Sequence, residues 1–256
     1  MPSDVALRAE TRGPLTVHLV ECVRDLGVDA FVTDRFGGVS ASPYDTLNLG
    51  DHVGDSLENV RENRRRVADA AGVDAARLVT VRQVHGADVL DASSVTSASE
   101  ADALVSDGDG DGVALAILVA DCVPLLLVDA STTRFALVHA GWRGLHHGVL
   151  ARTLRHFNDA ATVHVFLGPS ISREGYQVGP DVAEHFRDVP GALVADHDDR
   201  SRLDLRRVAI HQLTHAGVRD EHVVRSQQVT DGGEVFFSDR ATRPCGRFAL
   251  VAKRAS

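Results

Sequence analysis

Short, valine-rich apolar runs bounded by turn-forming residues recur along this 256-residue chain, and they constrain its fold more than any other feature. Such runs are typical of β-strands. Helical periodicity is rarer and does not alternate regularly with these runs. The pattern therefore favours a single α+β domain over residues 1–256, with mixed sheets, rather than a doubly wound parallel sheet. The expected strands cover residues 15–20, 30–33, 78–81, 87–90, 113–119, 125–128, 135–138, 162–167, 222–224 and 248–252.

Four segments have the pattern of helices: residues 55–71, 145–157, 181–187 and 204–216. Asp55 and Glu58 have capping-box spacing at the start of the first segment, and Gly72 follows its last residue. Residues 93–100 and 107–112 are expected to be polar loops. The second loop imitates the start of an EF-hand, but its twelfth position is Leu118 instead of Glu, which argues against calcium binding.

Charge and hydropathy exclude several classes of protein. The net charge is -9 and the pI is near 5.8, whereas a nucleic-acid-binding surface is basic. The longest apolar run, residues 112–128, contains Asp121 and is not a membrane span. Residues 1–14 lack the apolar core of a signal peptide. We therefore expect a cytoplasmic protein, monomeric or a small homo-oligomer, without nucleic-acid or membrane partners.

The cysteines and the lysine limit the available chemistry further. Cys22, Cys122 and Cys245 are odd in number and widely spaced, which does not suggest a disulfide framework and fits a reducing compartment. Lys253, in the C-terminal tail, is the only lysine. Schiff-base chemistry is therefore not expected.

Three segments each place a potential metal ligand next to a turn-forming glycine or proline. A lone histidine is usually structural, and a lone cysteine in an apolar run is usually a small buried hydrophobe. Together, however, two histidines and a cysteine are the ligands of zinc or copper sites that leave one coordination position open. The combination predicts a shared metal site made of His85, Cys122 and His139. The segments are Gln83-Val84-His85-Gly86, Ala120-Asp121-Cys122-Val123-Pro124 and Val138-His139-Ala140-Gly141-Trp142-Arg143-Gly144.

Charged residues near these segments are further candidates for the site. Burying Asp121 is costly unless its carboxylate is used or paired, so it is a candidate acid/base or a partner of the ligands. Arg143 and Arg64 are candidate anion contacts because guanidinium groups bind oxyanions bidentately. A solvated surface charge is the alternative for both arginines. A zinc ion held here would keep a net positive charge and one position for water or phosphate.

Other catalytic classes lack their motifs in this chain. The His-x-Glu and Pro-Cys-x-x-Cys pair of the nucleobase deaminases is absent. So are His-Glu-x-x-His, the Walker A sequence, Gly-x-Gly-x-x-Gly and Gly-x-Ser-x-Gly.

Several motifs in register over most of the chain resemble the polyphenol oxidoreductase laccase-domain family, whose better-supported activity is purine nucleoside phosphorylase. Besides the three ligand segments they are Arg35-Phe36-Gly37-Gly38-Val39-Ser40, Leu47-Asn48-Leu49-Gly50, Asn63-Arg64, Ala101-Asp102-Ala103-Leu104, Gly168-Pro169-Ser170-Ile171, Tyr176-Gln177-Val178-Gly179, Phe237-Ser238-Asp239-Arg240 and Gly246-Arg247.

The resemblance implies a layered α/β/β/α fold, zinc on His85, Cys122 and His139, and a purine nucleoside pocket near the metal. It implies phosphorolysis of adenosine, inosine and methylthioadenosine, with phosphate as co-substrate, and adenosine deaminase activity. Asn48, Arg64 and Arg143 lie in matching motifs and are expected in or near the substrate site. One departure is visible: many relatives have Cys-Thr where this chain has Val229-Thr230.

Three alternatives to phosphorolysis stay open. A copper-dependent phenol oxidase, the older label of the family, fits less well because the chain has no His-x-His pair for a multicopper centre. A metal-free hydrolase would use Cys122 as nucleophile and His139 as base. The family has been linked to hydrolysis that edits peptidoglycan precursors, and a hydrolase of this kind could perform it. A binding role with vestigial activity is the last alternative.

Overall fold

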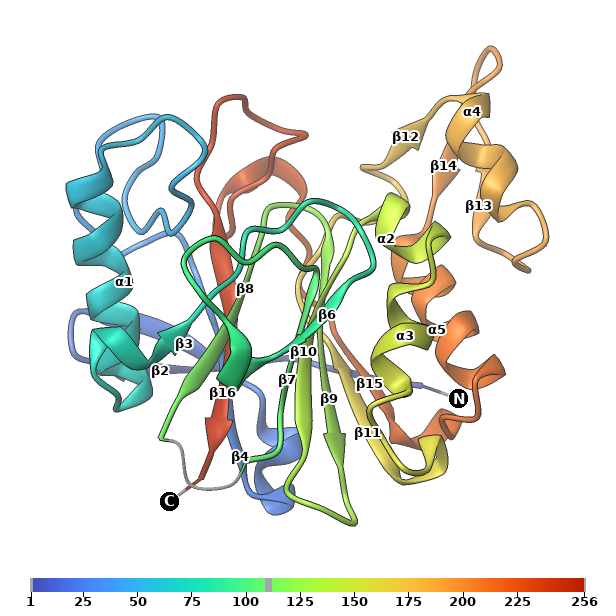
Figure 1. The fold of residues 1–256 in the computed structure, drawn as a ribbon. Coiled ribbons are helices and arrows are strands. Elements are labelled where there is room, and N and C mark those ends of the chain that lie inside the picture. The colour runs from blue at the N-terminus through green and yellow to red at the C-terminus, as the bar shows by residue number, and fades with distance from the viewer. Residues whose placement is uncertain (1, 109–111, 256) are drawn as a thin grey trace.

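The computed structural model describes residues 2–108 and 112–255, and in it two large β-sheets pack face to face (Figure 1). Helix α1 covers the outer face of one sheet, and α2, α3 and α5 cover the outer face of the other (Figure 1). This arrangement confirms the predicted α+β fold with mixed sheets in α/β/β/α layers. The central residues of the expected polar loop at 107–112, residues 109–111, lie outside the described part.

The larger sheet has seven strands. Pairing is parallel for β1 with β15, β11 with β15 and β6 with β7, and antiparallel elsewhere. In spatial order the strands are β1 (Ser3–Val5), β15 (Val223–Ser226), β11 (Val163–Leu167), β9 (Val123–Asp129), β10 (Phe135–Ala140), β7 (Ala103–Ser106) and β6 (Val89–Asp91).

Within the described part of the chain, the second sheet has six strands, and only the β5–β8 pair is parallel. In spatial order they are β2 (Arg8–Arg12), β3 (Leu15–Leu19), β4 (Val28–Thr33), β16 (Phe248–Arg254), β8 (Ala114–Val119) and β5 (Leu78–Val79).

Three apolar cores hold the layers together. The central core lies between the sheets and includes Ile117, Leu126 and Leu250, all completely buried. An outer core packs α3 and α5 on the larger sheet, and a smaller one packs α1 on the other sheet. Strands β8, β9 and β10 are buried along their whole length. Burial on both faces explains why they read as continuous apolar runs instead of alternating patterns.

The helices are short apart from two. None in the described part of the chain is long and apolar enough to cross a membrane. Their bounds are α1 (Leu57–Ala71), α2 (Trp142–His146), α3 (Val149–Leu154), α4 (Pro180–Ala183) and α5 (Leu205–His215).

Two details of the helix predictions are wrong. The helix expected over 145–157 is divided into α2 and α3, because Gly148 adopts a left-handed conformation with φ of 77° between them. The first residue before α1 is Ser56 rather than Asp55, and it makes no side-chain cap. The Asp55 carboxylate instead accepts hydrogen bonds from Ser40 Oγ and Asn48 Nδ2. Gly72 ends α1 as expected, with φ of 69°.

A small sheet was not predicted from the sequence. Its strands are only two or three residues long, too short to give a periodic signal. With α4 it lies beyond α2, at the upper right in Figure 1. Its strands, in spatial order, are β12 (Gln177–Val178), β14 (Ser201–Leu203) and β13 (Leu193–Ala195).

Candidate metal centre

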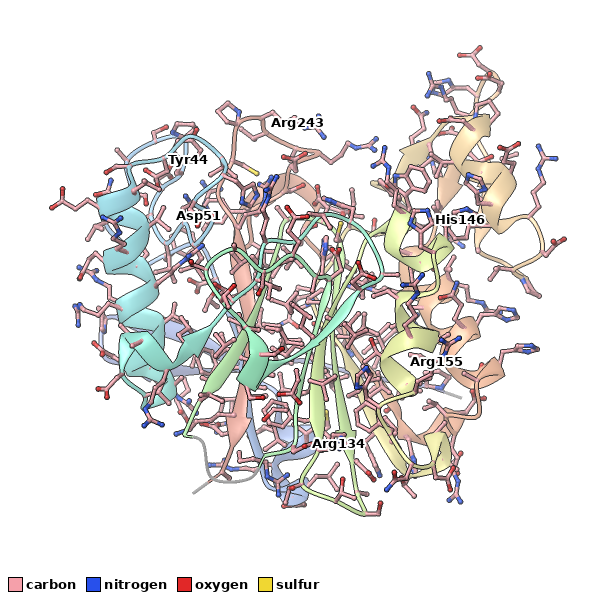
Figure 2. All side chains as sticks on the ribbon, viewed as in Figure 1. Tyr44, Asp51, Arg134, His146, Arg155 and Arg243 are labelled. Atoms are coloured by element: carbon pink, nitrogen blue, oxygen red, sulfur yellow. The ribbon has the colours of Figure 1, made fainter. Side chains whose placement is uncertain are left out.

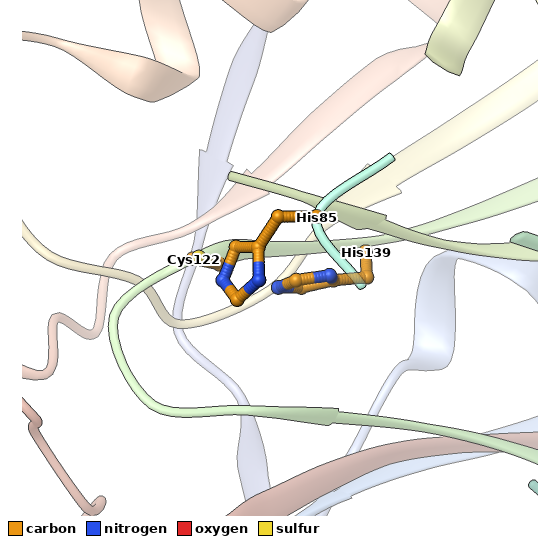
Figure 3. Close-up of side chains that lie close together, drawn as sticks. All are labelled: His85, Cys122 and His139. Atoms are coloured by element: carbon orange, nitrogen blue, oxygen red, sulfur yellow. The ribbon is translucent and has the colours of Figure 1, made fainter. Parts of the chain in front are cut away.

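The three predicted ligands come together at one end of the sandwich, and Figure 3 shows their side chains facing one another. One ligand atom from each of His85, Cys122 and His139 lies within 4.8 Å of the other two. The two imidazole rings meet edge to face, with centroids 4.8 Å apart. His139 is buried, Cys122 is partly buried and His85 is exposed. The cluster therefore has one side open to solvent. Among the described residues no other such group of ligand side chains is found.

The strand topology places these ligands. Cys122 lies in the turn between β8 and β9, where the chain passes from one sheet to the other. His139 lies near the end of β10, and its Cα is paired with Pro124 of β9. This register puts its ring next to the Cys122 turn. His85 comes from the loop between β5 and β6 and has φ of 58°, a left-handed conformation that is rare for residues other than glycine.

A missing side chain makes room for the cluster. At Gly141 an added Cβ would lie 2.8 Å from Cys122 Sγ and 3.2 Å from His85 Cδ2. These separations are shorter than van der Waals contact. Glycine at this position therefore leaves open the space in which the ligand atoms converge.

Electrostatics favours a thiolate at this position. Burial alone would raise the pKa of Cys122, but His139 and His85 outweigh burial and lower it to about 6. Burial likewise opposes protonation of His139, yet Cys122 and Asp102 raise the pKa of that imidazole to about 9. Without a metal, both shifts favour a thiolate beside an imidazolium. A thiolate is the form of cysteine that binds metal or acts as a nucleophile.

Asp102 contacts two of the ligand segments and was not singled out in the sequence. It is completely buried, and its carboxylate lies 2.7 Å from Nδ1 of His139. It also accepts hydrogen bonds from the backbone N–H groups of His85 and Gly86. The sequence did carry a signal, since an acid directly before an apolar strand is costly to bury without partners.

Asp121 is buried beside Cys122, and its carboxylate has three donors within the chain. It accepts hydrogen bonds from Thr230 Oγ1 at 2.6 Å, Ser238 Oγ at 2.7 Å and the Arg240 backbone N–H at 2.7 Å. Asp121 thereby ties the segment before β16 to the turn that carries Cys122. Thr230 is the residue that follows Val229, where the chain departs from the family pattern, and the tie does not require a cysteine at that position.

Asn48 and Arg64 lie on the side of α1. Asn48 is completely buried; its Nδ2 donates to Gly50 O and to Asp55, and its Oδ1 accepts from Gly50 N and Arg247 N. Arg64 Nε donates to Leu49 O, and its Nη2 lies 3.3 Å from Asp51. Both side chains thus contact the loop that precedes α1. Figure 2 places Asp51 of this loop and Arg243 at the end of the molecule opposite Arg134.

Arg143 lies on the other side of the cluster, in α2. It is exposed, and its guanidinium carbon stacks 4.4 Å above the Trp142 ring. A cavity of about 580 Å3, lined by Trp142, Tyr176, Arg240 and neighbouring residues, opens beside α2. None of the three ligands lines this cavity, but the backbone N–H of Arg240, one of its lining residues, donates to Asp121, which is next to Cys122 in the chain. A larger cavity, of about 800 Å3, is lined by Gly72 and Lys253 and by none of the predicted ligands.

The residues present fit a transition metal. Zinc bond lengths imply ligand atoms roughly 3.3–3.6 Å apart in a tetrahedral site, so a small closure of the cluster would suffice. Cys122 is predisposed to ionise, and Nδ1 of His139 is occupied by Asp102, which leaves Nε2 for a ligand bond. Two imidazoles and a thiolate suit zinc and also suit copper.

Comparison with known proteins gives a consistent result. Residues 29–255 match the family described as multi-copper polyphenol oxidoreductase laccase. The chain belongs to this family. "Purine nucleoside phosphorylase YfiH" of Escherichia coli K12 is 39% identical over 229 residues, which is 87% of this chain and 92% of that protein. "Purine nucleoside phosphorylase Rv2149c" of Mycobacterium tuberculosis H37Rv is 37% identical over 226 residues, 86% of this chain and 89% of that protein.

Solved structures of family members have the same fold. YlmD from Geobacillus stearothermophilus superposes with a TM-score of 0.89 at 31% identity, over 98% of this chain and 99% of that one. The Neisseria meningitidis protein NMB0706 has a TM-score of 0.83 at 34% identity, over 90% of this chain and 95% of that one. The names of the sequence relatives and the family description support an enzyme.

Proposed function

We propose that this chain is a zinc-dependent purine nucleoside phosphorylase that acts on adenosine, inosine and methylthioadenosine and also deaminates adenosine. The observation that carries the proposal is the open cluster of His85, Cys122 and His139 in a chain whose relatives are named purine nucleoside phosphorylases. We treat residues 1–256 as one domain that acts in the cytoplasm. The free thiols Cys22, Cys122 and Cys245 support a reducing compartment.

In phosphorolysis a phosphate oxygen bonds to C1′ of the ribose while the bond from C1′ to the purine breaks, and the purine leaves with the electron pair and takes a proton. In deamination, water replaces the 6-amino group and ammonia leaves. A zinc ion bound here would supply a Lewis acid at the open side of the cluster.

The chain's own residues would orient the substrates. Arg143 is exposed beside the cluster and is suited to an oxyanion such as phosphate, as its stacking on Trp142 holds the guanidinium in place. Arg64 would contact the substrate from the side opposite Arg143, next to the loop that precedes α1. Asn48 and Asp121, whose polar atoms are bonded within the chain, would act by holding the loops that flank the substrate.

Product analysis tests this function. Zinc-loaded protein incubated with adenosine is expected to release adenine only when phosphate is present, and to form inosine by deamination. Both products should disappear after chelation. Metal analysis of the purified protein separates zinc from copper, because the family description would favour several copper ions per chain. Zinc-loaded protein that forms neither adenine nor inosine would reject the proposal.

A second function has a specific observation in its favour. The side chains of Cys122, His139 and Asp102 are arranged in the order nucleophile, base and orienting acid. The His139 imidazole lies in the middle and contacts both the Cys122 thiol and the Asp102 carboxylate. A metal-free hydrolase, such as one that edits peptidoglycan precursors, could use this order. The copper-dependent oxidase is a weaker candidate because the cluster holds only three nitrogen and sulfur ligands.

Thiol reactivity distinguishes the metal centre from a free nucleophile. With the pKa of Cys122 lowered to about 6, its thiolate predominates above that pH and is lost as the pH falls through it. In chelated protein, we expect iodoacetamide to label Cys122 at a rate that has its half-maximum near pH 6. Zinc should suppress the labelling, since a metal-bound thiolate is protected. The Cys122→Ala variant gives the background from Cys22, which is exposed. A half-maximum near pH 8.5, the pKa of an ordinary thiol, would show that His139 and His85 do not lower the pKa of Cys122.

A further inference from the structure

The carboxylate of Asp102 lies between two of the three ligand segments. It immediately precedes β7, which pairs with β6 on one side and β10 on the other. The side chain is completely buried and has no guanidinium or ammonium partner among the residues that the structure describes. All of its interactions are with the His139 ring and with the loop that carries His85.

The first interaction fixes the His139 ring. Oδ1 of Asp102 lies 2.7 Å from Nδ1, and the Asp102 carbonyl accepts the His139 backbone N–H at 2.7 Å. A carboxylate at Nδ1 requires a proton on that nitrogen, which leaves Nε2 as the ligand atom. Both the tautomer and the ring orientation are therefore determined by one residue.

The second interaction fixes the backbone of the His85 loop. Oδ2 accepts from Gly86 N at 2.6 Å and Val84 N at 3.3 Å, and Oδ1 accepts from His85 N at 3.0 Å. Three successive N–H groups that converge on one anion form a nest. His85 in the centre of this nest has φ of 58°, a conformation that persists only where the surroundings determine it. The carboxylate supplies that determination.

We propose that Asp102 is a positioning residue that couples the two histidine ligands, so that a single buried carboxylate sets the tautomer of His139 and the left-handed turn that presents His85. The proposal deepens the proposed function and rests on it only for the identity of the metal. It assigns to Asp102 no contact with the substrate.

Zinc affinity of the Asp102→Asn variant tests the coupling. Asparagine keeps the size of the side chain but cannot accept hydrogen bonds with both of its terminal atoms. We expect about 10- to 100-fold weaker Zn2+ binding, measured by competition with a chromophoric chelator. The matched control is Asp129→Asn. Asp129 is also a buried carboxylate with several donors, at the other end of β9, where it accepts from Ser131 and Thr132. That variant should bind Zn2+ like the wild type.

Two measurements on the wild-type chain keep the test independent of how well the variant folds. In metal-free protein the backbone N–H groups of His85 and Gly86 should exchange slowly with solvent although their loop is at the surface. In zinc-loaded protein, nitrogen-15 NMR should show a proton on Nδ1 of His139. Fast exchange at both amides, or a proton on Nε2, would overturn the proposal.

The outcomes separate this proposal from the proposed function. Tight Zn2+ binding without phosphorolysis would reject the function, while a weakened Asp102→Asn variant would still support the coupling. A folded Asp102→Asn variant that binds Zn2+ within twofold of the wild type would overturn the coupling whatever the substrate. If the wild type binds no Zn2+, slow amide exchange that is lost in Asp102→Asn still supports the nest, and unchanged exchange rejects it.

Discussion

Replacing Cys122 with serine is expected to remove zinc from the protein and to reduce phosphorolysis by about a thousandfold, which corresponds to the several kcal/mol that a metal contributes to such a reaction. The hydroxyl of serine does not ionise near neutral pH, whereas the neighbouring histidines lower the pKa of the Cys122 thiol to about 6. Metal content of the purified variant and the rate of adenine release measure the two effects.

The fold should survive this change, because Cys122 lies in a turn and is only partly buried. Its thermal unfolding in the presence of chelator should match that of the chelated wild type. Cys22→Ser is the matched control, since Cys22 is exposed and should leave zinc binding and activity intact. Stoichiometric zinc and full turnover in Cys122→Ser would reject the assignment of the metal centre.

Gly141→Ala is expected to weaken metal binding without altering any ligand. The new methyl group would lie 2.8 Å from Cys122 Sγ, and cysteine has a short side chain that can move only by rotating away from the cluster. Overpacking of this kind costs about 1–3 kcal/mol, equivalent to roughly 5- to 150-fold weaker binding. Chelator competition measures the loss. Backbone strain is not involved, because φ of Gly141 is -79°, a value that alanine adopts readily.

Gly148→Ala provides the comparison at the other end of α2. Apart from the adjoining backbone, no atom lies within 4 Å of an added Cβ there, but φ is 77°, so alanine should cost about 1–2 kcal/mol of folding stability. We expect this variant to unfold at a lower temperature and to bind zinc normally. The two glycines would thus separate loss of space at the site from loss of backbone freedom. Equal zinc affinity in Gly141→Ala and wild type would show that the cluster does not need this space.

Most strands of the two large sheets could be predicted because burial leaves a local trace in the sequence, but β1, β2 and β7 lie outside the predicted runs. Strands β8, β9 and β10 are apolar apart from Asp129 and His139 near the strand ends, and their bounds agree with the predicted runs to within two residues. The ligands could be predicted for a similar reason, since His85, Cys122 and His139 are unusual residues at the ends of such runs. The pairing of strands into sheets leaves no comparable trace.

The features that escaped prediction depend on contacts between distant residues or on single backbone angles. Asp102 and His139 are 37 positions apart and meet only because β7 pairs with β10. Gly148 could have been accommodated in a continuous helix, and nothing in the local sequence shows that its φ is positive. Asp55 has the spacing of a cap, but its carboxylate binds Ser40 and Asn48 in the preceding loop.

The turn that carries Cys122 has a mechanical consequence. The three ligands come from three different places. Cys122 lies at the junction of the two large sheets, His139 near a strand end of the seven-stranded sheet, and His85 in the loop that follows β5 of the six-stranded sheet. A bound ion would therefore cross-link the two sheets at this end of the sandwich. Conversely, the affinity of the protein for the ion would depend on how closely the two sheets pack against each other. A substitution such as Leu250→Ala, in the core between the sheets, would weaken binding of the ion even though it changes none of the ligands.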